Sequence, residues 1–137
     1  PPRSTLFPYT TLFRSEPPQV CLPSNIELLP ACEHAMAIKN MQIFSAGLIP
    51  FKQTKLTASV DPVKYYEYRA LGLPVISTAF GEMAFREDKP GVFLTGESDL
   101  DSLVSAALSY KSTLQEIMQF RGDNDWNMRF SRCGLLS

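Results

Sequence analysis

Lys64 and Glu67 are the charged residues of this sequence whose spacing best suits ligand chemistry. They lie three positions apart within Asp61–Thr78, DPVKYYEYRALGLPVIST, so a helix puts both side chains on one face. A lysine at a helix N-terminus can bind a diphosphate together with the backbone N–H groups there. A glutamate one turn later can accept hydrogen bonds from both hydroxyls of a ribose. The alternative, which spacing alone slightly favours, is an exposed ion pair worth only about 0.2–0.5 kcal/mol.

The elements that must position this pair are a short helix and the strand after it. Asp61 is a good N-cap, and Pro62 at the first helical position loses no hydrogen bond. Gly72 can adopt the left-handed conformation that ends a helix, and Pro74 prevents its continuation. The apolar residues Val75 and Ile76 then begin a strand of the kind that is buried on both faces of a parallel sheet.

Strands and helices alternate along the rest of the sequence. Apolar runs predict strands near residues 26–29, 46–50, 74–78 and 91–95, and helices are predicted at Ala31–Met41, at the Asp61 unit, from Ser98 or Asp99 to about Tyr110, at Ser112–Phe120 and at Asn124–Phe130. Arg121-Gly122-Asp123 is expected to be a turn. This pattern predicts an α/β protein with a Rossmann-like open parallel sheet and helices on both faces.

Loops that follow parallel strands form the binding edge of such a fold. Phe51–Val60 is one of them, and it is mostly polar and carries Lys52 and Lys55. Ser59, just before the predicted N-cap, can offer a hydroxyl to a phosphate. A solvated loop whose lysines bind nothing is an equal alternative. Ala79–Pro90 is predicted to be a loop with charges of both signs.

Composition excludes several other functions. The 137 residues are 45% hydrophobic with a formal net charge of −1, so no strong field directs the chain to nucleic acid. No dinucleotide fingerprint, P-loop, nucleophile elbow or metal-ligand cluster occurs, and we expect no metal. Cys21, Cys32 and Cys133 are predicted to be reduced thiols in a cytoplasmic protein. His34, the only histidine, is predicted to lie on a helix flank rather than to act in catalysis.

The first fifteen residues, PPRSTLFPYTTLFRS, are expected to be a disordered artefact. Every residue of Thr5–Ser15 matches the translation of a common short-read sequencing adapter. The chain is therefore expected to be a fragment that lacks an upstream part. We predict a linker over residues 16–24, one domain over residues 25–130, and a frayed end over residues 131–137.

The central stretch resembles the nucleotide-sugar-binding domain of GT-B glycosyltransferases. The likeness covers about Asn25–Phe130: IPF at the end of a strand, DPVKYYEYRALGLPV, GVFL, an acid-capped apolar helix, and W-x-x-R-F at Trp126–Phe130. The resemblance implies that Lys64 contacts the diphosphate and assists its departure, that Glu67 holds the ribose, and that the Val63 backbone approaches the nucleotide.

The same resemblance implies transfer of a sugar from a UDP- or GDP-sugar to a carbohydrate or lipid-linked acceptor. The acceptor-binding domain is expected to be missing, so the chain alone should be inactive. The resemblance also allows peripheral membrane association of the full enzyme. Many retaining members carry a second glutamate where this sequence has Ser59, which leaves the stereochemistry open. Alternatives are a nucleotide-sugar epimerase on the same scaffold and a non-catalytic flavodoxin-like or receiver-like domain.

Overall fold

The computed structural model describes residues 4–6, 24–28, 32–96 and 99–134. The chain divides into two compact units, Pro1–Ala37 and Ile38–Ser137. Helix α1 (His34–Met41) contains the boundary between them. It begins three residues later than predicted, and Ala31, the first residue of the prediction, lies outside the described ranges.

The first unit contains a pair of parallel strands, β1 (Ser4–Leu6) and β2 (Ile26–Leu28), with Ser4 opposite Ile26. The predicted strand at residues 26–29 is therefore present, but its hydrogen-bonded partner is β1 and not the predicted larger sheet. β1 lies in the segment that we expected to be a disordered artefact, and that expectation stays a prediction, as does its adapter origin. The linker predicted at residues 16–24 lies outside the described ranges except for Ser24.

The second unit is built on a three-stranded parallel sheet in the order β3 (Gly47–Ile49), β4 (Val75–Thr78) and β5 (Val92–Thr95). Val75 lies opposite both Gly47 and Val92. Val75 and Ser77 of the central strand are fully buried. The Ser77 hydroxyl is satisfied because it donates a hydrogen bond to the Ile49 carbonyl, 3.0 Å away. An α/β fold with an open parallel sheet is confirmed.

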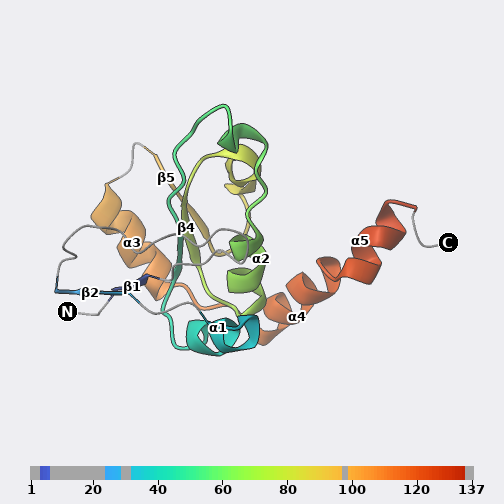
Figure 1. Ribbon diagram of the computed structural model, residues 1–137, viewed down its shortest axis with the longest axis horizontal. Coiled ribbons are helices and arrows are strands. Elements are labelled where there is room, and N and C mark those ends of the chain that lie inside the picture. Colours follow the sequence, from blue (N-terminus) through green and yellow to red (C-terminus); the bar gives the residue numbers. More distant parts are fainter. Residues whose placement is uncertain (1–3, 7–23, 29–31, 97–98, 135–137) are drawn as a thin grey trace. The chain divides into compact units, whose positions relative to one another are not determined.

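Helices cover this sheet on both sides. Helix α2 (Val63–Ala70) contacts β3 and β4, while α3 (Leu100–Ser109) contacts β4 and β5 from the opposite side (Figure 1). Helix α4 (Leu114–Asp123) packs on α2 and is followed by α5 (Trp126–Arg132). Two short 3-10 helices, η1 (Thr57–Ser59) and η2 (Gly81–Arg86), contact each other. Within the part of the chain that the structure describes, no helix is both long enough and apolar enough to cross a membrane.

Several boundaries differ from the sequence predictions. η2 occupies a stretch predicted as loop, and α4 continues through Arg121-Gly122-Asp123, where we predicted a turn. The helix ends at Asp123, and the side-chain amide of the C-cap residue Asn124 donates to the Phe120 carbonyl, 2.8 Å away. The predicted last helix starts two residues late, after the N-cap Asp125, and ends at Arg132, whose guanidinium pairs with Asp123 at 2.9 Å. Residues 131 and 132, which we expected to fray, are therefore helical.

Candidate functional site

Helix α2 follows the carboxyl end of β3 through the loop at residues 51–60, as the sequence predicts. Its end is the predicted one: Gly72 has a φ of 78°, and the Leu73 N–H donates to the Tyr68 carbonyl at 2.9 Å. Its start differs. Pro62 is not the first helical residue but the N-cap, with φ −76° and ψ 119°, and it leaves the first turn without a side-chain cap among the described residues.

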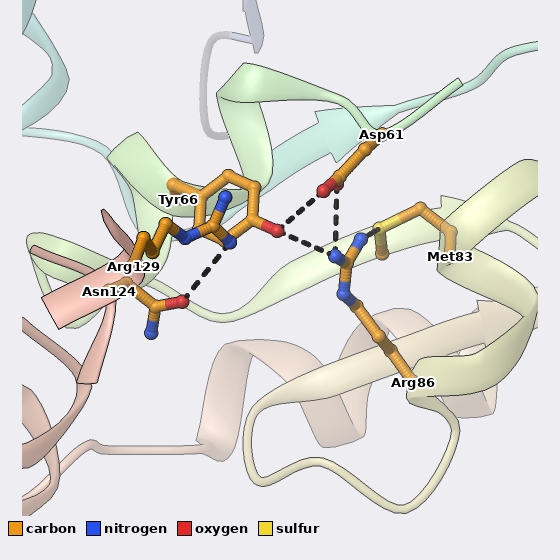
Figure 2. A network of polar contacts seen from close by, with 6 residues as sticks. All are labelled: Asp61, Tyr66, Met83, Arg86, Asn124 and Arg129. Atoms are coloured by element: carbon orange, nitrogen blue, oxygen red, sulfur yellow. Dashed lines mark hydrogen bonds and ion pairs between the residues drawn. The ribbon is translucent and has the colours of Figure 1, made fainter. Parts of the chain in front are cut away.

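The prediction that Asp61 is the N-cap is wrong, because its carboxylate binds two side chains and not the first N–H groups of the helix. One oxygen accepts from Arg86 Nη2 at 2.9 Å, and the other accepts from the Tyr66 hydroxyl at 2.6 Å (Figure 2). The guanidinium gives the carboxylate a charged donor, and the Tyr66 hydroxyl gives it a second donor. The Asp61 carboxylate, which the local sequence predicts as the cap of α2, therefore binds Arg86 instead.

Lys64 and Glu67 are brought together on α2. Lys64 Nζ lies 2.6 Å from Glu67 Oε2, and the side chains are 21% and 10% exposed. The pair is thus more enclosed than the surface ion pair that spacing alone favours. A lysine and a carboxylate in this arrangement present a cation and an acceptor side by side, in the first turns of a helix that follows a parallel strand. The two charges can separate to bind a phosphate and a hydroxyl.

The other two predicted site residues flank this ion pair without being part of it. Ser59 is the exposed last residue of η1, and Val63 is the first residue of α2, with 66% of its surface exposed. The loop that carries Ser59 is held at the carboxyl end of the sheet. Thr78 donates to the Phe51 carbonyl, and the Gln53 side chain donates to the Ala79 carbonyl. Its two lysines, Lys52 and Lys55, are exposed.

Sequence analysis missed a cluster of arginines and tyrosines beside α2. The Arg86 guanidinium lies over the Tyr65 ring, 4.2 Å from its centroid, and donates to the Tyr66 hydroxyl at 2.8 Å. Arg129 of α5 lies over the Tyr66 ring, 4.4 Å from the centroid (Figure 2). No local pattern predicts this cluster, because Arg86 and Asp61 lie 25 positions apart in the sequence. The charge of Arg86 is the sequence signal that was present.

The tyrosines of α2 predict a loss of stability at alkaline pH. Burial raises the pKa of Tyr65, Tyr66 and Tyr68 above the ordinary value of 10.0, and the hydrogen bond to Asp61 raises the pKa of Tyr66 further. A raised pKa means that the folded state favours the neutral phenol. The stabilisation is therefore complete below pH 10 and is lost as pH rises through the folded-state pKa values.

The measurement is tyrosinate absorbance together with urea unfolding across this pH range. We expect these three phenols to ionise above the ordinary pKa while the protein is folded, and the free energy of unfolding to fall between pH 10 and their folded-state pKa values. Ionisation of all tyrosines as one class near the ordinary value, with stability unchanged, would contradict the prediction.

The fold and this site define the class of the protein only as an α/β domain with an open parallel sheet and a charged helix start at its carboxyl edge. Among the described residues, no three His, Cys, Asp or Glu side chains form a group that could hold a metal ion. Comparisons with protein-family models, curated proteins and solved structures find no match to this chain.

Proposed function

We propose that this chain is the donor-nucleotide-binding part of a GT-B glycosyltransferase. The full enzyme transfers a sugar from a UDP- or GDP-sugar to a carbohydrate or lipid-linked acceptor. The observation that carries the proposal is the Lys64–Glu67 pair, 2.6 Å apart and largely enclosed, at the start of a helix that follows a parallel strand. Ligands of α/β sheets bind at that edge.

The roles of the residues follow from their charges. Lys64 and the first turn of α2 receive the diphosphate, and Lys64 stabilises the charge that develops on it as the sugar leaves. Glu67 accepts hydrogen bonds from the ribose hydroxyls, the Val63 backbone approaches the nucleotide, and the Ser59 hydroxyl contacts a phosphate. Binding exchanges the Lys64–Glu67 ion pair for two ion–ligand contacts, so neither charge is left without a partner.

The proposal is tested by titrating the chain with UDP and with GDP, followed by calorimetry or by backbone amide signals. We expect Lys64→Ala and Glu67→Ala each to weaken binding by about 10- to 100-fold, since a hydrogen bond to a charged group is worth about 1.5–3 kcal/mol. Because the pair is largely enclosed, either substitution should also lower the free energy of unfolding, by about 1–3 kcal/mol, so binding is compared under conditions in which every variant is folded.

Lys111→Ala is the matched control. Lys111 is exposed and lies between Tyr110 and Ser112, which approach the glycines that precede β5 and β4. It is therefore at the amino edge of the sheet, far from the start of α2, and its loss should leave binding unchanged. Equal affinity of the wild type, Lys64→Ala and Glu67→Ala would refute the site. Absence of any response to UDP and GDP would favour a non-catalytic α/β domain.

A further inference from the structure

We infer that Tyr66 couples the seating of α5 on α2 to the position of the Arg86 end of η2, which makes α5 a conformational switch. In one state Arg129 of α5 covers the Tyr66 ring and Arg86 is held by the Tyr66 hydroxyl. In the other state α5 is released and Arg86 is held less firmly. The inference goes beyond the proposed function and does not rest on it.

Helix α5 is weakly attached to α2. None of its seven residues, all of them described, is buried, and its large apolar side chains Trp126, Met128 and Phe130 are 68%, 43% and 40% exposed. It meets α2 where the Arg129 guanidinium lies 4.4 Å from the centre of the Tyr66 ring (Figure 2). An exposed contact of this kind shifts an equilibrium by only about two- to fivefold. An element with so few buried contacts can open while the rest of its unit stays folded.

Arg86 attaches the end of η2 to the same tyrosine. Its Nη2 donates to the Tyr66 hydroxyl at 2.8 Å and to one Asp61 oxygen at 2.9 Å. The Tyr66 hydroxyl donates in turn to the other Asp61 oxygen, 2.6 Å away. The Arg86 side chain is 12% exposed, and its guanidinium lies 4.2 Å from the centre of the Tyr65 ring. These contacts therefore fix the last residue of η2 beside α2.

The two arginines act on different parts of one rigid side chain. Arg129 lies over the ring of Tyr66, whereas Arg86 and Asp61 bind its hydroxyl (Figure 2). A movement of the ring when Arg129 leaves therefore changes the geometry of both hydrogen bonds, and hydrogen bonds weaken steeply as their angles depart from linear. Such coupling is reciprocal, so loosening Arg86 must also weaken the seating of α5.

The coupling links α5 to the loops at the carboxyl edge of the sheet. η2 follows β4, and its Glu82 N–H donates to the Val60 carbonyl of the loop before α2, 3.1 Å away. Any molecule that binds one state of α5 more tightly than the other would therefore shift η2 as well.

The test measures amide hydrogen exchange in the variant Arg129→Met. The Lys89 N–H donates to the Arg86 carbonyl at 3.0 Å and reports the turn that Arg86 holds. The Gly47 N–H donates to the Pro74 carbonyl at 2.8 Å and is the internal reference in the sheet. We expect the Lys89 amide to exchange about two- to fivefold faster than in the wild type, with the Gly47 rate unchanged.

The variant Tyr66→Phe separates coupling from a general loss of stability. It keeps the ring beneath Arg129 and removes the hydroxyl that binds Arg86. In this background Arg129→Met should leave the Lys89 exchange rate unchanged. Arg86→Met measures the opposite direction: the Arg129 N–H, which donates to the Asp125 carbonyl at 3.0 Å, should exchange about two- to fivefold faster.

Arg121→Met is the matched control. It removes the same charge from α4, where Arg121 Nε donates to the Ala70 carbonyl at the other end of α2, 2.7 Å away, and it should leave the Lys89 rate unchanged. Equal Lys89 exchange in the wild type and in Arg129→Met would overturn the inference. An increase of the same size in Arg121→Met, or in the Tyr66→Phe background, would do so too. A failure of nucleotide binding would leave the inference standing, because none of these measurements uses a nucleotide.

Discussion

Replacing Phe80 with alanine is expected to lower the free energy of unfolding by about 3–5 kcal/mol. The Phe80 side chain is 2% exposed and lies at the carboxyl end of β4, where its ring packs on Phe51 with centroids 5.0 Å apart. Truncation removes the contacts of a buried ring and leaves a cavity that its neighbours only partly fill. Since domains of this size are stable by about 5–15 kcal/mol, the loss is a large share of the total. Urea unfolding followed by circular dichroism measures it.

The matched control for this prediction is Phe85→Ala. Phe85 is the same residue type, lies five positions further along the chain and is 80% exposed. Its truncation should change the free energy of unfolding by no more than about 0.5 kcal/mol. Comparable losses from the two substitutions would show that Phe80 is not part of the core.

Replacing Gly81 with alanine is expected to lower the free energy of unfolding by roughly 2–5 kcal/mol. Gly81 has a φ of 44°, and a left-handed conformation costs an alanine about 1–2 kcal/mol. A Cβ at this position would also lie 2.4 Å from the Val60 carbonyl oxygen and 2.7 Å from that of Thr57. These are backbone atoms of the loop that leads to α2, so the overlap adds about 1–3 kcal/mol.

The affected loop carries Ser59, so Gly81→Ala should also weaken nucleotide binding if the proposed function is right. Gly122→Ala is the control for stability. Gly122 lies inside α4, and apart from its chain neighbours and the adjacent backbone of that helix, no described atom lies within 4 Å of the position its Cβ would take. Alanine there should raise the free energy of unfolding by about 0.5–1 kcal/mol. A stability loss at Gly122, or none at Gly81, would contradict this account.

The predicted elements that match the structure are those encoded by neighbouring residues. Gly72 and Pro74 end α2 where they should, because a left-handed glycine and a proline act within one turn of the chain. Asp99 caps α3 as predicted, and its carboxylate accepts from the Ser102 N–H at 3.1 Å. The spacing of Lys64 and Glu67 likewise suffices to bring them together, since the helix alone determines that distance.

The predictions that failed involve partners distant in sequence. Asp61 satisfies every local rule for an N-cap, but Arg86, brought alongside by the η2 turn, takes its carboxylate. Residues 26–28 form a strand as predicted, yet their pairing partner is Ser4–Leu6 and not a strand of the larger sheet. A strand pattern specifies which residues can pair but carries no label for the strand they pair with.

The sequence by itself determined the alternation of strands and helices, the class of fold, and the juxtaposition of Lys64 with Glu67. Each follows from apolar periodicity, glycine and proline positions, or helix geometry, all of which act over a few residues. Only the tertiary structure decided that this ion pair is largely enclosed and that Asp61 binds Arg86 instead of capping α2. It also decided that Gly81 lies against the loop that precedes α2. Those features depend on which surfaces pack together, and packing joins residues that no local pattern connects.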